Sequence, residues 1–573
     1  MSSLESASTA SSTLDSLLDS QLHNLLCRIR SLTTILQGPK ECDPATAAKE
    51  NAIPDFFNHL TTLLSCGDKD NQDGAKAIAV TGATFVEGFR ALVVTPTNPD
   101  ATTDFAGLLK VQKIARDEDR TVDDVVEGAI DVPLQEHIKD IITVLSGLEF
   151  DTVSGTSDDF NHFCIFVVAR CFRTLRARVL SDKVLRERVF NTLRFWKPPD
   201  EFDVPILKFG RGDTILHWVH FLAWILTKLD SAVKDVHQVY SSQTNVDAKI
   251  FSRVNALCRD LYFFLELKDG YIVRTLLKSV ENVFRLRVTD SDKDVGKERQ
   301  TDMRMEKQEN MATLVLRYLK GIASWHTAIF ALLQDTKTKE LAKSATVGLI
   351  EVYPQSEEVA PFAELEKEYY RRFPRADVQE RRDIVALLGE HYKPAFTGSV
   401  HAEAALMGIF NHYYQNNAPP LPQDVVDVPD LLRELVDPLC LDNFWLASCD
   451  PYMVLELRRA NKGRAIAVSE KCCWCCQRLR ELVEPKIALP GTHGILVAWN
   501  PPSVGIDAKV LEKLGDELWL KLRRRLWDRA SSMAHLDHSS GTSPETLPIT
   551  DMALPASEKK EEIDEATSWA RYD

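Results

Sequence analysis

The sequence contains no apolar run long enough to cross a lipid bilayer. The longest run extends from Ile215 to Leu226 and is interrupted by two histidines, whereas a membrane-spanning helix needs about 20 apolar residues. Residues 1–15 are polar and serine-rich, without the basic segment and the apolar segment of a secretory signal. These absences predict a cytoplasmic or nuclear protein with no membrane partner.

The chain also lacks a surplus of positive charge and a disulfide pattern. Its net charge of −15 argues against wrapping of nucleic acid by the whole molecule, although a local basic groove is still compatible with it. Outside one cluster the cysteines are scattered, and Cys27 and Cys164 lie in apolar helical runs. Cysteine behaves there as a small hydrophobic residue, so we expect a reducing compartment.

Several enzyme signatures are missing. The sequence has no glycine-rich phosphate loop, no G-x-S-x-G nucleophile elbow and no protein-kinase motif set. No repeat of fixed period is strong enough to indicate a named solenoid. Nucleotide-hydrolysing, serine-hydrolase and kinase classes are therefore set aside.

Helical periodicity dominates from about residue 14 to about residue 392. Apolar residues recur at three- and four-residue spacings in 14–36, 122–148, 160–195 and 248–286, as in amphipathic helices. The polar link 288–302 is a candidate break between two subdomains. The sequence predicts a mostly α protein, with a disordered N-terminus over 1–13 and a large α-helical region over 14–392 that would bind an unidentified protein partner.

The pattern changes near Pro394. Strand candidates at 464–468 and 495–499 alternate with helices, of which the last is the amphipathic segment 508–527. We therefore predict a smaller C-terminal α/β domain over 393–530. The remainder, 531–573, is rich in Ser, Pro, Thr, Glu and Lys and is predicted to be a disordered tail.

Two motifs in this domain carry chemistry. The first is His401-Ala402-Glu403, and the second is the run Cys472-Cys473-Trp474-Cys475-Cys476. Together they supply three zinc ligands and one carboxylate. Two C-x-x-C registers exist, Cys472/Cys475 and Cys473/Cys476, and the local sequence does not separate them. Either pair, at the first turn of a helix, would point to one side, near backbone N–H groups that stabilise thiolate.

Glu403 is the candidate catalytic residue. Two positions after the histidine, a carboxylate can reach a metal-bound water without itself ligating, take the proton of the water and pass it to a leaving amine. A zinc ion lowers the pKa of that water from about 15.7 toward 7. The motifs thus predict Zn²⁺ as the cofactor and His401 as one of its ligands.

The segment from about Ser399 to about Leu526 resembles the zinc-dependent nucleotide and nucleic-acid deaminase superfamily, the cytidine-deaminase-like fold. It is most similar to a fungal deaminase-like family within that superfamily. The resemblance covers about a quarter of the chain and rests on the cysteine cluster and four short elements: Val400-His401-Ala402-Glu403, Ser469-Glu470-Lys471, Gly491-Thr492-His493-Gly494 and Trp499-Asn500-Pro501-Pro502.

The resemblance implies a three-layer α/β/α domain and hydrolysis of the exocyclic amino group of a nucleobase. The substrate would be a nucleoside, a nucleotide or a single-stranded nucleic acid. The position of Ser469, four residues before the first ligand, selects His401, Cys473 and Cys476 as the metal ligands. Cys472 replaces the proline that usually precedes the first cysteine. Because 391–400 leaves little room for the expected β-hairpin, we expect either a truncated sheet or a sheet completed by strands from 346–354.

Other interpretations of the same residues stay open. The domain would be a structural zinc module of a non-catalytic helical scaffold if a third cysteine filled the fourth metal position. His493 would orient substrate or support a ligand, or it would only stabilise its glycine turn. The basic residues Lys521 and Arg523–Arg525 would contact phosphate, but their spacing favours a surface amphipathic helix.

Overall fold

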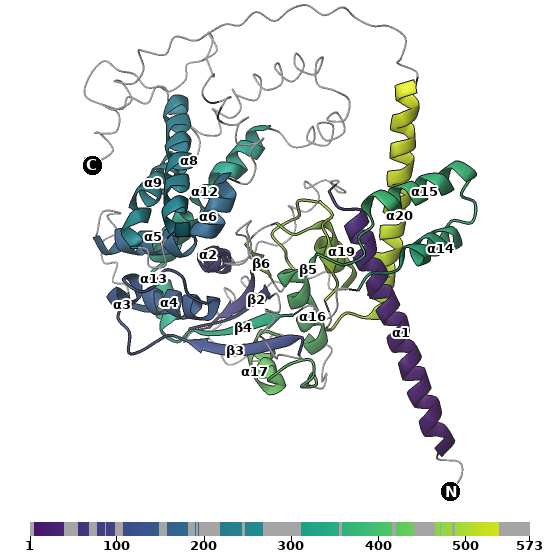
Figure 1. Cartoon of the computed structure of the whole chain (residues 1–573). Coiled ribbons are helices and arrows are strands. Elements are labelled where there is room, and N and C mark those ends of the chain that lie inside the picture. Colours follow the sequence, from purple (N-terminus) through teal and green to yellow (C-terminus); the bar gives the residue numbers. More distant parts are fainter. Residues whose placement is uncertain are drawn as a thin grey trace, which may run out of the picture.

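We describe the protein from a computed structural model of the chain (Figure 1). The described residues are 5–38, 55–67, 77–85, 88–97, 107–147, 158–180, 190, 193, 218–242, 247–266, 311–353, 358–414, 420–440, 465–469, 471–483, 487–502 and 504–537. The candidate break at 288–302 and the predicted tail after residue 537 lie outside these ranges.

The described chain is mainly helical, as predicted, and its helices surround a mixed five-stranded sheet (Figure 1). The strand order is β3-β4-β2-β1-β6. β2 and β4 run parallel, whereas the other three neighbouring pairs are antiparallel. The strands are β1 (Ala79–Thr84), β2 (Phe89–Pro96), β3 (Leu109–Ala115), β4 (Thr346–Val352) and β6 (Ala467–Val468). No helix in the described ranges has both the length and the apolar character needed to cross a membrane.

Four of the five strands lie within the region that the sequence predicts as helical. The prediction for 14–392 is wrong at β1, β2 and β3. The short apolar runs of β1 and β2 do not distinguish a buried strand from a piece of buried helix, whereas β3 alternates buried and more exposed residues, as a strand with one covered face does. β4 lies in the segment 346–354, one of the two alternatives for the sheet, and it pairs with β2 and β3.

Each face of the sheet is covered by its own hydrophobic core. Val80 and Val93 are paired across β1 and β2 and belong to one core, whereas the next pair, Ala79 and Val94, belongs to the other. Successive residues of a strand point to opposite faces. The result is a layer of helices on each side of the sheet, assembled from segments far apart in the sequence.

The first core is formed mainly by helices from the first three-fifths of the chain. They are α2 (Asp55–Leu64), α3 (Val122–Val126), α4 (Leu134–Gly147), α5 (Asp158–Arg170), α6 (Phe172–Leu180), α8 (Trp218–Ser242), the short 3-10 helix η2 (Ala248–Phe251), α9 (Ser252–Glu266), α12 (Met311–Gln334) and α13 (Thr336–Lys343).

The second core lies on the opposite face and holds the two predicted motifs. Its elements are α1 (Glu5–Ile35), α14 (Phe362–Arg372), α15 (Val378–His391), α16 (Ala402–Tyr414), α17 (Pro429–Cys440), α19 (Trp474–Val483), α20 (Ala508–Asp537) and a two-stranded parallel sheet of β5 (Ser399–Val400) and β7 (Trp499–Asn500).

The helix α1 packs beside α20 (Figure 1), and Leu32 and Leu518 share the second core. The predicted boundary at 392/393 therefore does not separate two cores. The helices α1 and α20 extend into the two ends predicted to be disordered, over 5–13 and 531–537. Extending a helix that tertiary packing has already nucleated costs little.

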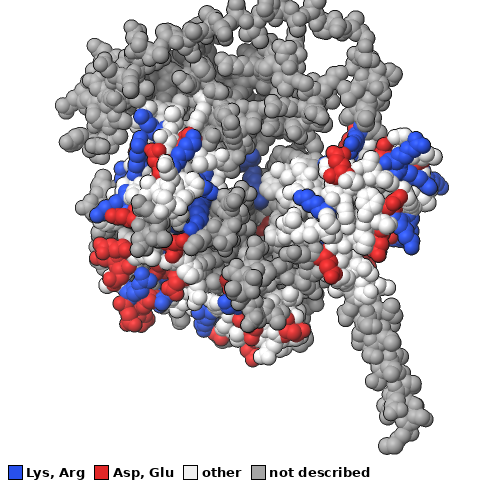
Figure 2. Space-filling view, viewed as in Figure 1, with Lys and Arg blue, Asp and Glu red and all other residues white. Residues whose placement is uncertain are grey.

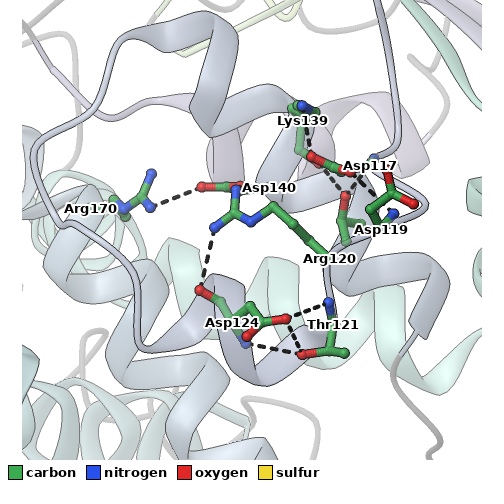
Figure 3. Close-up of polar contacts among 9 residues, drawn as sticks. Asp117, Asp119, Arg120, Thr121, Asp124, Lys139, Asp140 and Arg170 are labelled. Carbon is green, nitrogen blue, oxygen red and sulfur yellow. Dashed lines mark hydrogen bonds and ion pairs between the residues drawn. The ribbon is translucent and has the colours of Figure 1, made fainter.

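A buried carboxylate joins α4 and α5 to the segment before α3 (Figure 3). Asp140, on α4, accepts hydrogen bonds from Arg120 Nη1 at 2.6 Å and from Arg170 Nη2 at 2.9 Å. The side chains of Asp140 and Arg170 are only 3% and 2% exposed. Beside them Thr121 and Asp124 form the capping box that begins α3. Each buried charge depends on its partner, since neither can be solvated by water.

Substitution of Asp140 by Asn should lower the free energy of unfolding by about 3–5 kcal/mol, because Arg170 would keep a buried charge without its carboxylate. Urea denaturation at pH 7 measures this loss. The matched control is Asp131→Asn, since Asp131 pairs with Arg173 at 3.1 Å but is 43% exposed, and it should cost less than about 1 kcal/mol. Equal losses in the two variants would contradict the prediction.

Two histidines are enclosed in the helical layer around the first core. His137 Nε2 lies 2.8 Å from the carbonyl oxygen of Leu63, and His326 Nε2 lies 3.0 Å from Asn255 Oδ1. Burial lowers the pKa of both imidazoles to about 3. Each stays neutral in the folded chain but takes up a proton in the unfolded chain below its ordinary pKa, about 6.5. Stability is therefore complete above that value and is lost as the pH falls toward 3.

Each of these histidines should cost on the order of 2 kcal/mol of stability at pH 5 relative to pH 7. His326→Gln keeps a hydrogen-bonding side chain that does not titrate in this window. The decrease in Tm between pH 7 and pH 5 should thus be smaller in the variant than in the wild type, as measured by circular dichroism. Parallel pH profiles for the two proteins would refute this.

Candidate metal centre

The two motifs meet where the helices α16 and α19 begin. α16 and α19 pack against each other, and His401 and Cys473 are the residues that immediately precede them. The N–H of Ala405 donates to the carbonyl oxygen of His401 at 3.0 Å, and the N–H of Gln477 donates to that of Cys473 at 3.1 Å. Both residues therefore occupy N-cap positions, so their side chains project from the positive ends of two helices.

Three ligand atoms converge at this point. Cys473 Sγ and Cys476 Sγ are 3.5 Å apart, and Cys476 Sγ lies 3.5 Å from His401 Nδ1. All three atoms lie within 4.8 Å of one another. Tetrahedral coordination with metal–sulfur and metal–nitrogen bonds of about 2.3 and 2.0 Å places two sulfurs about 3.8 Å apart and a sulfur and a nitrogen about 3.5 Å apart. The group can thus hold one metal ion.

Tertiary structure selects one of the two cysteine registers. Among the described residues, the group around His401 contains Cys473 and Cys476 but neither Cys472 nor Cys475, although all four thiols are buried. The N–H of Cys476 donates to Cys473 Sγ at 3.4 Å, so the first cysteine also caps α19. The helix itself holds the two sulfurs on one side.

Buried charge shapes the ionisation of the group. Burial raises the pKa of the Cys473 thiol, but hydrogen bonds from Cys475 and Cys476 and the imidazolium of His401 lower it well below its usual range. Burial likewise opposes a charge on His401, whose pKa is nonetheless raised well above its usual value by the Cys473 thiolate and by Glu403. Burial raises the pKa of Cys476. Metal binding would have to displace protons from His401 and Cys476.

Glu403 lies in the first turn of α16, beside the ligand group. Its Oε1 is 3.5 Å from His401 Nδ1, and its side chain is 8% exposed, whereas the His401 side chain is 20% exposed. A carboxylate at this position is favoured by the helix dipole. The ligand group itself does not include Glu403. The arrangement places a mostly buried carboxylate next to the group that could hold a metal ion.

The loop of Gly491 to Gly494 packs against the cysteine turn. The N–H of Cys472 donates to the carbonyl oxygen of Gly491, and the N–H of His493 donates to that of Cys472, both at 3.1 Å. Gly491 and Gly494 have φ of 99° and 72°, values that favour glycine. His493 Nδ1 accepts a hydrogen bond from the N–H of Ile495 at 3.1 Å. This ring nitrogen stabilises the loop, and a role of His493 toward substrate stays a prediction.

Residues of α1 that belong to none of the sequence motifs hold β7, the strand next to the site. Arg30 Nε donates to Asn500 Oδ1 at 2.8 Å, and Thr33 Oγ1 accepts a hydrogen bond from the N–H of Trp499 at 3.2 Å. Asn500 is paired with Val400, the residue before His401. No local pattern could have shown these contacts, since about 470 residues separate the partners.

The basic residues of α20 take part in packing. Arg523 Nε donates to Glu380 Oε1 at 2.8 Å, and Arg525 Nη1 donates to the carbonyl oxygen of Ile35 at 2.8 Å. Lys521 Nζ lies 4.5 Å from the ring centre of Trp474. These contacts agree with the predicted surface amphipathic helix, in which Leu522 and Leu526 are buried. On the face shown in Figure 2, Lys and Arg are interspersed with Asp and Glu over the described surface.

No family model, curated protein or solved structure matches this chain. The chemistry of the centre therefore rests on its own side chains.

Substitution of His401 by Ala or of Cys476 by Ser should remove about one bound metal ion per chain, because two remaining ligands do not hold the ion tightly. Elemental analysis of zinc-equilibrated, dialysed protein measures the change. Cys475→Ser is the matched control, since Cys475 is buried in the same turn but lies outside the ligand group. Unchanged metal content in His401→Ala would exclude this centre.

Proposed function

We propose that the protein is a zinc-dependent hydrolase that removes the exocyclic amino group of a nucleobase, in a free nucleoside or nucleotide or in a single-stranded nucleic acid. The observation that carries the proposal is the convergence of His401, Cys473 and Cys476 with the carboxylate of Glu403 beside them. The resemblance of the motifs to the deaminase superfamily supports the same chemistry, and we propose a deaminase-like fold around the centre.

Zinc is the metal that suits this ligand set. Thiolate and imidazole are its common protein ligands, and catalytic zinc sites provide three of them and leave a fourth position open. Within the described chain neither Cys472 nor Cys475 joins the group. This supports a catalytic rather than a purely structural role, because a structural zinc site is usually closed by four protein ligands.

When bound, the metal would make hydroxide available near neutral pH by lowering the pKa of a coordinated water from about 15.7 toward 7. Glu403 then carries the protons. Its carboxylate accepts a proton from the attacking water and returns one to the departing nitrogen. The reaction forms a bond from water oxygen to the ring carbon that bears the amino group, and the carbon–nitrogen bond breaks to release ammonia.

The buried position of Glu403 fits this role. Its backbone is fixed in the first turn of α16, two residues beyond the helix cap formed by His401. A proton carrier held in this way keeps one orientation relative to the metal position through the reaction. The reducing conditions of the cytoplasm or nucleus, where we propose that the protein acts, would keep the cysteine ligands from forming disulfides.

The second candidate is a scaffold protein whose zinc site only stabilises the fold. The large helical layer around the first core favours it, because that layer contributes no residue to the metal centre and offers surface for a protein partner. The two functions differ in what they require of Glu403, since only the hydrolase needs its carboxylate.

Glu403→Gln should reduce ammonia release about 10²- to 10⁴-fold, because the amide cannot carry the proton, and should leave the zinc content unchanged. The assay offers cytidine, adenosine, their nucleotides and single-stranded DNA and RNA oligonucleotides as substrates. Glu481→Gln, on the partly exposed side of α19, is the control and should change neither quantity.

Two outcomes would favour the scaffold. One is zinc-loaded protein that releases ammonia from none of these substrates, and the other is release that is the same in the wild type and in Glu403→Gln. Loss of zinc together with unfolding of the Cys473→Ser variant would then indicate a structural zinc site.

A further inference from the structure

A second group of metal-ligand side chains lies outside the centre described above. His23 and Cys27 stand four residues apart on α1, and Glu358 lies on the segment between β4 and α14. His23 Nε2 is 2.9 Å from Glu358 Oε2 and 3.6 Å from Cys27 Sγ. The three ligand atoms all lie within 4.8 Å of one another.

We propose that His23, Cys27 and Glu358 form a second zinc site that fastens α1 to the segment leading into α14. Two residues four apart on a helix face the same side, so both can reach one ion. In a tetrahedral site the imidazole nitrogen would lie about 3.5 Å from the sulfur and about 3.4 Å from the carboxylate oxygen. The first separation is already present, and the second requires only that the exposed Glu358 side chain withdraw slightly.

The surroundings of Cys27 suit a thiolate ligand. Arg30 Nη1 lies 3.9 Å from Cys27 Sγ and also donates to the carbonyl oxygen of Glu358 at 3.2 Å. Hydrogen bonds of this kind around a coordinating sulfur stabilise the ligand. Thiolate and carboxylate together neutralise a divalent ion, so the occupied site would add no net positive charge beside Arg30. Burial raises the pKa of the free Cys27 thiol, so binding would release the proton of the thiol to water as the sulfur–metal bond forms.

The three proposed ligands differ in how far their side chains are exposed to solvent. Cys27 is buried, whereas the side chains of His23 and Glu358 are 50% and 68% exposed. A metal ion can therefore reach the three ligand atoms directly from solvent. A solvent-exposed histidine–glutamate pair by itself contributes little stability. An ion pair between His23 and Glu358 also does not explain why Cys27 Sγ lies near the same ring nitrogen.

The site would act on the same support that holds the first centre. Arg30 contacts Cys27 and Glu358 on one side and Asn500 of β7 on the other. β7 pairs with β5, which leads directly into His401. An ion that fixes α1 to Glu358 would thus also fix the helix that carries Arg30 and Thr33. Its role is structural, and it does not depend on the proposed hydrolase activity.

Metal stoichiometry of the full-length chain tests the proposal. Zinc-equilibrated wild type, dialysed against metal-free buffer, should contain about two zinc ions per chain. His23→Ala and Glu358→Gln should each lower this to about one, and His23→Ala combined with His401→Ala should leave none. His162→Ala removes an exposed histidine outside both groups and should leave the content unchanged. His23 and Glu358 are exposed, so their substitution leaves the core intact.

Cobalt substitution identifies the ligand. In a chain with His401→Ala and Cys476→Ser, bound Co²⁺ should still show thiolate-to-metal charge-transfer absorption, and Cys27→Ser should abolish it. Metal content that neither His23→Ala nor Glu358→Gln changes would overturn the proposal and leave a simple hydrogen bond between the two side chains. If only His401→Ala fails to lower the content, the first centre is refuted and the second stands.

Discussion

The candidate metal ligands depend on one packing contact, that between α16 and α19. His401 caps one helix and Cys473 caps the other, so a ligand atom from each motif is fixed by the start of a helix. Backbone N–H groups at these ends favour negative charge, which suits both the thiolate of Cys473 and the carboxylate of Glu403. A small shift of either helix along its axis would separate the histidine from the sulfurs.

That contact is supported from both sides. On one side α16 packs on β1 and β2 of the main sheet, whose far face is covered by the helical layer around the first core. On the other side α1 holds β7 through Arg30 and Thr33, and β7 holds the strand that leads into His401. The site therefore requires the beginning, the middle and the end of the chain together, even though its ligands come from the C-terminal part.

Local features of the fold could be predicted from the sequence. The amphipathic helices, the strand leading into the cysteine turn and the helix over 508–527 follow from short-range periodicity. The strands β1 and β2 could not be recognised, because largely buried strands lose the alternation that marks a strand with one exposed face. β3 does alternate, but its seven residues are a short signal between long helical segments. The contacts of α1 with the C-terminal elements could not be predicted either, since periodicity indicates that a helix has an apolar face but not what covers that face.

The sequence by itself determined which residue types are available for metal chemistry: one histidine, one nearby carboxylate and four cysteines in five positions. Spacing allowed two equivalent cysteine pairs. Only the tertiary structure decided that Cys473 and Cys476 face His401, because the direction of each side chain is set by where α19 begins and how it packs on α16. In the same way His23, Cys27 and Glu358 carry no shared sequence signal and become a group only because α1 packs against the segment that leads into α14.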